Sequence, residues 1–127
     1  MRYLPIRLHP GQDLRGALEA LNVGAAFVVQ GIGSLNPAMI RYAGMDDATA
    51  LHGDVEILTL AGSLSPDGAH LHITISDAQG QVLGGHVAQG CIIRTTAEIL
   101  VALLPDHAFS REDDPATGCK ELTIRPA

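Results

Sequence analysis

The stretch that decides the fold is Ala69-His70-Leu71-His72-Ile73-Thr74-Ile75-Ser76-Asp77-Ala78-Gln79-Gly80-Gln81-Val82-Leu83-Gly84-Gly85-His86. From His70 to Ser76, polar and apolar side chains alternate, which is the period of a strand with one buried face. Residues 77–80 have the composition of a three-residue hairpin loop, and Gly80 suits its left-handed position. The stretch therefore predicts a β-hairpin.

The register of this hairpin brings three histidines to one face. The loop places Ile75 opposite Leu83 and His72 opposite His86, while His70 lies two residues from His72 on the same strand. A shift of one residue would put His86 among the buried isoleucines, which the alternation disfavours. Opposed side chains lie about 5 Å apart at Cβ. Imidazole nitrogens reach a shared metal ion at about 2 Å, so the geometry allows a metal site.

Two interpretations of the histidines remain open at this point. His70, His72 and His86 form a metal site, or they are ordinary surface or hydrogen-bonded strand residues. Gly84 and Gly85 favour the first interpretation, because absent side chains leave room for an ion, a water or a ligand.

The composition predicts a single domain over residues 1–127. Hydrophobic residues make up 46% of the chain and aromatic residues only 3%, so aliphatic side chains must fill the core. The formal net charge is −6 and the basic residues are scattered, which excludes a general attraction to nucleic acid. There is no run of eighteen apolar residues and no signal-peptide core, so no membrane span is expected. Cys91 and Cys119 lack metal or redox spacing, which suits a cytoplasmic protein.

The rest of the chain predicts mostly strands. Helical spacing of apolar residues predicts one main helix over residues 12–22, and residues 43–54 are expected to form a loop. Residues 97–104 fit either structure by periodicity, and we favour a strand that continues from the β-branched residues before them. Further strands are predicted at residues 1–8, 25–30, 36–42, 55–64 and 120–124.

These elements predict an α+β domain around a mainly antiparallel, twisted sheet. Gly31 and Gly33 are interpreted as a tight turn or bulge, because the third glycine and following helix of a phosphate loop are missing. Residues 65–68, Ser-Pro-Asp-Gly, predict a turn into the histidine hairpin.

Short motifs over nearly the whole chain resemble the plants-and-prokaryotes-conserved (PPC) domain family. Each motif is short, but their order and combination are specific. The motifs are Gly33-Ser34-Leu35, Val55-Glu56-Ile57-Leu58, Leu60-Ala61-Gly62-Ser63-Leu64, Pro66-Asp67-Gly68, His70-Leu71-His72, Gly84-Gly85-His86 and Arg111-Glu112-Asp113-Asp114-Pro115-Ala116-Thr117-Gly118.

The resemblance implies a compact α+β fold assembled as a homotrimer. It also implies that His70, His72 and His86 hold zinc or another divalent transition metal. In plants the domain is joined to an AT-hook that enters the DNA minor groove, and family members often carry a DNA-binding label. This sequence has no such segment, so we do not expect direct DNA binding. Residues 53–58 match a plant partner-contact segment, with Asp54 in place of its arginine.

Two functions follow from these features. The first is a homotrimeric zinc-binding module with a regulatory or ligand-binding role. The alternative is a metal-dependent lyase or hydrolase acting on a small anionic carbonyl compound, because three histidine ligands leave a fourth position for water or substrate. The fold is also similar to that of acetolactate decarboxylase, which places a metal on a comparable histidine set.

For the enzyme, Glu56 is the candidate catalytic base and Arg111 the candidate anion-binding residue. Glu98 and Arg94 are alternatives for the same roles. Each of these side chains also fits an ion pair at the surface or at a trimer interface. A third hypothesis is that the histidines line that interface and are purely structural.

Overall fold

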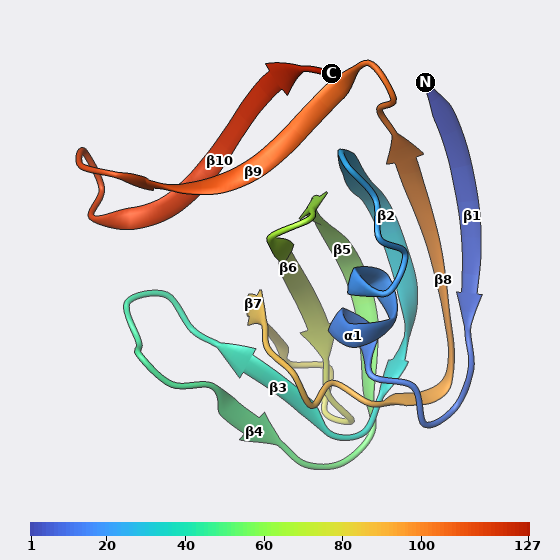
Figure 1. The fold of residues 1–127 in the computed structure, drawn as a ribbon. Coiled ribbons are helices and arrows are strands. Elements are labelled where there is room, and N and C mark those ends of the chain that lie inside the picture. The colour runs from blue at the N-terminus through green and yellow to red at the C-terminus, as the bar shows by residue number, and fades with distance from the viewer.

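The computed structural model describes all 127 residues as ten strands and one helix (Figure 1). Eight strands form one sheet in the order β1-β8-β2-β5-β6-β7-β3-β4, and β9 and β10 form a separate two-stranded sheet. Every strand pair is antiparallel, as expected. In chain order the elements are β1 (Arg2–Leu8), α1 (Leu14–Glu19), β2 (Ala26–Leu35), β3 (Ala38–Arg41), β4 (Thr49–Leu51), β5 (Val55–Ser65), β6 (Gly68–Ser76), β7 (Val82–Val87), β8 (Ile93–Leu103), β9 (His107–Asp114) and β10 (Cys119–Pro126).

The core lies between the inner face of the large sheet and α1, which sits in the hollow of the curved sheet (Figure 1). Leu14 and Leu18 of the helix join a cluster of 22 buried residues with strand residues such as Leu71, Ile73 and Ile75. The apolar half of the histidine strand is therefore buried in the core, as its alternation predicts. The opposite, outer face of β6 carries the histidines.

The helix is shorter than residues 12–22. The Asp13 side chain accepts a hydrogen bond from the Gly16 N–H and caps its start, and the helix ends at Glu19. The Leu21 N–H bonds to the Leu18 carbonyl, which tightens the last turn, and Asn22 adopts a positive φ of 53°. No helix of the structure is long and apolar enough to cross a membrane.

Two strands lie where the sequence predicted none. The predicted loop over residues 43–54 contains β4, which pairs with β3 at the edge of the sheet. The chain before the final predicted strand contains β9, which pairs along its whole length with β10. Both strands form because they pair with a neighbouring strand. Their own residues give no signal, because an exposed stretch such as Thr49–Leu51 shows no alternation of buried and exposed side chains.

The other sequence interpretations of the sheet are confirmed. Residues 97–104 fall almost entirely in β8, so the strand was the right choice. Gly31 and Gly33 lie inside β2, where shifts in register between Val28 and Gln30 and between Gly33 and Leu35 mark bulges.

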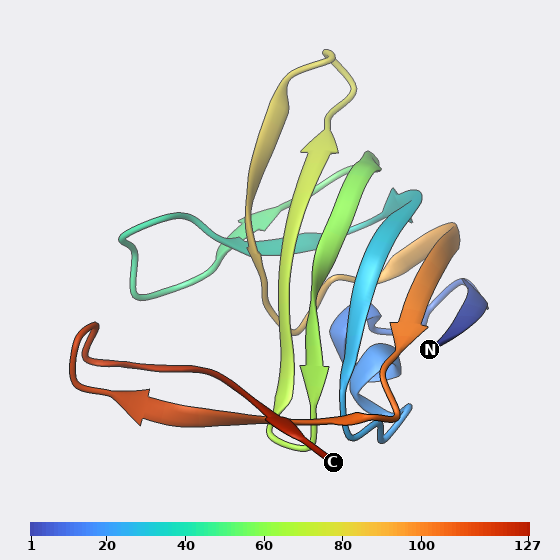
Figure 2. The ribbon, with the colours of Figure 1, turned by 90° about the horizontal axis from the view of Figure 1, so that it is seen from above.

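The β9–β10 hairpin crosses the outer face at one end of the sheet (Figure 2). The rings of Phe109 and Phe27 pack edge to face, with centroids 5.5 Å apart. The Arg111 N–H bonds to the Asp67 carboxylate in the β5–β6 turn, at 2.8 Å. These contacts hold β9 beside the histidine end of β6.

Candidate metal centre

The histidines come together through the predicted register of β6 and β7. His72 lies opposite His86, and Ile75 lies opposite Leu83. The same cross-strand row continues to Ala61 of β5 on one side and to Arg41 of β3 on the other. The row is fixed by backbone pairing across four strands, so His72 and His86 share one face of the sheet.

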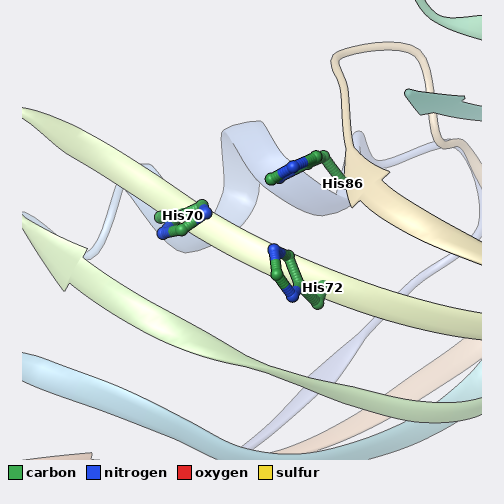
Figure 3. Close-up of side chains that lie close together, drawn as sticks. All are labelled: His70, His72 and His86. Atoms are coloured by element: carbon green, nitrogen blue, oxygen red, sulfur yellow. The ribbon is translucent and has the colours of Figure 1, made fainter. Parts of the chain in front are cut away.

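The three rings form a compact cluster (Figure 3). Ring centroids lie 4.5 Å apart for His72 and His86, 5.1 Å for His70 and His72, and 5.4 Å for His70 and His86. One nitrogen from each ring lies within 4.8 Å of the others. Nitrogens that share a tetrahedral zinc ion at about 2 Å lie about 3.3 Å apart, so modest ring rotations complete the set. The three side chains fit a zinc-type metal.

Gly84 and Gly85 have a different role from the one expected. A Cβ on Gly84 would lie 2.6 Å from the Ile73 carbonyl oxygen, and one on Gly85 would lie 2.6 Å from the Arg41 carbonyl oxygen. Neighbouring backbone therefore fills the space that their missing side chains leave. The glycines allow β7 to approach the strands on both sides, which sets the position of His86.

Toward His70, β6 and β7 separate, since their pairing ends at His72 and His86, while β7 continues to pair with β3 along its other edge. Helix α1 bridges the gap. The Glu19 carboxylate accepts a hydrogen bond from the Ala69 N–H at 3.0 Å, and Arg15 reaches the Val87 carbonyl at 3.5 Å. His70 lies at the mouth of this separation.

A hollow of about 440 Å³ opens beside the cluster, and His70 and His86 both line it. We call it the basic hollow, because it contains one more basic than acidic side chain. Its charged lining residues are Arg15, Arg41, Arg111, Lys120, Asp46, Asp47 and Asp67. Of these, the sequence singled out only Arg111. No local motif in the sequence groups Arg15, Arg41 and Lys120, because they lie on three separate elements, α1, β3 and β10.

Arg111 contacts the cluster directly. Its Nη1 lies 3.1 Å from Nδ1 of His70, and its Nη2 donates a hydrogen bond to the Lys120 carbonyl at 2.7 Å. The two residues of this contact are 41 positions apart in the chain, and the β9–β10 hairpin brings them together. The structure thus places the predicted anion-binding residue beside the predicted metal ligands.

Two of the three histidines, His70 and His86, are held in the neutral form. Burial, followed by the positive charge of Arg111, lowers the pKa of His70 to about 4. Burial, followed by the charge of Arg41, also lowers the pKa of His86. Neutral imidazole is the form that binds a metal, so His70 and His86 need lose no proton near pH 7.

Glu56, the candidate base, lies elsewhere in the chain. It is exposed on β5, opposite Ser76 and Ser34, about 15 Å along the strand from the row of Ala61 and His72. Glu98 and Arg94 line the same separate hollow as Glu56. Arg94 forms an ion pair there with Asp54 at 3.0 Å. Within one chain, the structure does not bring Glu56 to the histidines.

Cys91 is fully buried away from the histidines. Its thiol donates a hydrogen bond to the Met39 carbonyl, and burial raises its pKa. It is a packed core residue, whereas Cys119 is exposed.

Comparison with known families decides what this fold is. A family model described as the Plants and Prokaryotes Conserved (PCC) domain matches residues 1–105. The chain belongs to this family. The resemblance found in the sequence motifs, to the family written PPC above, is therefore confirmed.

Two solved structures match nearly the whole chain. A hypothetical protein from Salmonella cholerae-suis is 39% identical, with a TM-score of 0.95 and coverage of 98% of this chain and 94% of that one. A protein from Archaeoglobus fulgidus described as metal-containing is 26% identical, with a TM-score of 0.82 and coverage of 97% and 94%.

A curated relative, the bifunctional protein GlmU of Synechococcus sp. (strain JA-2-3B'a(2-13)), is 49% identical over 130 residues. The match covers 99% of this chain but only 21% of that protein. The chain therefore spans about a fifth of the length of this relative.

The lowered pKa of His70 predicts how the metal-free protein responds to acid. As the pH falls from about 6.5 toward about 4, the unfolded chain protonates His70 and the folded chain does not. Folding stability should therefore fall over this range and level off below it. Urea unfolding with a chelator present, at several pH values, measures this slope. The His70→Gln variant should show a shallower slope, and an unchanged slope would contradict the prediction.

Proposed function

We propose that this PCC protein is a homotrimeric metal-binding module that also binds a small anionic ligand. His70, His72 and His86 are the metal ligands, and zinc is the first candidate metal. The observation that carries the proposal is the convergence of three imidazoles from two strands beside a basic hollow. The metal-containing description of the Archaeoglobus relative supports it.

The chain's own residues suit both parts of this role. Three imidazoles supply nitrogen ligands, and the partial exposure of the cluster leaves a side open toward the solvent. Zinc bound there would supply a Lewis acid with a free position for a water or a carboxylate oxygen. Arg111, in contact with His70, and Arg41, opposite His86 on β3, both line the basic hollow and supply positive charge to attract and orient an anion.

Direct DNA binding forms no part of the proposal. The net charge is −6, and the four basic side chains of the hollow are accompanied by three aspartates. Many phosphate contacts require basic side chains that are not balanced in this way.

The metal content of purified protein tests the first part. The wild type should bind about one zinc ion per chain, and His72→Ala should lose it, because two histidines seldom hold zinc alone. Elemental analysis by mass spectrometry after zinc loading and desalting gives the ratio. His52→Ala is the matched control, since His52 lies outside the cluster. Wild type without zinc, or His72→Ala with an unchanged ratio, would refute the metal site.

A homotrimer is supported by the outer face of the sheet. Phe27, Val29, Ile32 and Leu58 expose between 39% and 50% of their surface there. A shallow, mostly apolar hollow of about 650 Å³ between β1, β8 and β2 includes Ile32. Apolar surface of this kind is typical of an interface between subunits.

Light scattering after size exclusion tests the assembly. The wild type should have three times the chain mass of 13.3 kDa. Ile32→Asp should give a smaller species, because a carboxylate would be desolvated in the interface. Met45→Asp, at an exposed position in the loop between β3 and β4, should leave the mass unchanged. A monomeric wild type would rule out the trimer.

Binding of a small anion tests the ligand. Pyruvate, an anionic carbonyl compound, should bind zinc-loaded wild type and not His72→Ala, because both metal and basic side chains are required. Isothermal titration calorimetry measures the affinity, and proton NMR of the same samples follows the pyruvate. Its conversion to another product would favour the metal-dependent enzyme over the binding module. The absence of binding to the zinc-loaded wild type would exclude this ligand class.

A further inference from the structure

The contact between Arg111 and His70 fixes the proton on the histidine ring. A guanidinium group has five N–H donors and no acceptor, so Nδ1 of His70 must accept the bond at 3.1 Å. A neutral imidazole has one acceptor nitrogen and one N–H. Nε2 of His70 therefore carries the proton.

In this state neither nitrogen of His70 is free to bind a metal. Nε2 is blocked by its proton, and the lone pair of Nδ1 is used by Arg111. Coordination through Nδ1 would replace the Arg111 N–H with the metal. Coordination through Nε2 would move the ring proton to Nδ1. The Nδ1–H of His70 and the N–H of Arg111 would then face each other. Both routes break the hydrogen bond from Arg111.

We propose that Arg111 blocks metal binding by His70 in the metal-free protein. Metal uptake displaces the Arg111 guanidinium into the basic hollow, where the guanidinium becomes the receptor for a ligand carboxylate. This inference rests on the proposed metal-binding function. It adds an order of events, in which the metal first releases the arginine and the anion then binds the released arginine.

The surroundings of Arg111 permit this movement. The Arg111 backbone N–H is held by the Asp67 carboxylate, so β9 keeps its place. Apart from His70, the guanidinium is held only by the Lys120 carbonyl. Arg111 already lines the hollow of about 440 Å³, together with Arg15 and Arg41. A rotation of the side chain alone therefore keeps the guanidinium within reach of an anion there.

The exchange couples the two ligands. An anion that pairs with the released guanidinium stabilises the state in which His70 is free, so it must increase metal affinity. By thermodynamic linkage the metal increases anion affinity by the same factor. A carboxylate is suited to bind the released Arg111, because it accepts two parallel hydrogen bonds from the guanidinium. The single lone pair of His70 Nδ1 accepts only one.

The first experiment measures the proton on His70 in the metal-free wild type. Nitrogen-15 NMR of histidine-labelled protein, with His70→Gln used for assignment, distinguishes the two neutral tautomers. The Nε2–H tautomer is expected. The Nδ1–H tautomer would overturn the proposal without any change to the arginine.

The second experiment measures zinc affinity by competition with a chromophoric chelator. Arg111→Met should bind zinc about three- to tenfold more tightly than the wild type, because a competing hydrogen bond of about 1 kcal/mol is gone. Arg41→Met is the matched control, since it removes the same charge beside the cluster but no hydrogen bond to a histidine. Equal tightening in both variants, or none in Arg111→Met, would overturn the displacement.

The third measurement repeats the zinc titration with pyruvate present. Pyruvate should tighten zinc binding by a larger factor in the wild type than in Arg111→Met, and equal factors would overturn the receptor role. Failures remain distinguishable. If the wild type binds no zinc, both the proposed function and this inference are refuted. If the wild type binds zinc and Arg111→Met leaves the zinc affinity unchanged, only this inference is refuted.

Discussion

The register between β6 and β7 is the constraint on which the site depends. Ile73 and Ile75 are buried in the core cluster, and the alternation of a strand then turns His70 and His72 outward. A shift of one residue in β7 would bury the His86 imidazole, at a cost of several kcal/mol without a hydrogen-bond partner. The histidine cluster is therefore fixed by the packing of the opposite face.

The surroundings of the cluster come from the separation of these same strands. Where β6 and β7 part, backbone groups lose their sheet partners, and side chains of α1 supply replacements. The β9–β10 hairpin closes the other side through Phe109 and Arg111. The four basic side chains of the hollow that results come from four separate elements. Its charge belongs to the tertiary structure and to no single segment.

Local patterns predicted the parts of this protein that local forces determine. The hairpin register, the turn at residues 65–68 and the strand nature of residues 97–104 all follow from alternation and turn chemistry. The patterns failed where pairing alone makes a strand, as in β4 and β9. They could not give the distance from Arg111 to His70, or show that Glu56 lies in another hollow, because both depend on strand order. The glycines of β7 were noticed but misinterpreted, since their neighbours come from non-adjacent segments.

The core explains why the metal and the anion belong together. The 22 buried residues of the core include no histidine, so the fold has its apolar interior without a metal, unlike small domains that zinc alone holds folded. A divalent cation at the cluster would lie close to Arg111 and Arg41, and the like charges raise its free energy. An anion between the metal and these arginines reverses that penalty. The positive charges of Arg111 and Arg41 then favour the loaded state only when both ligands are present.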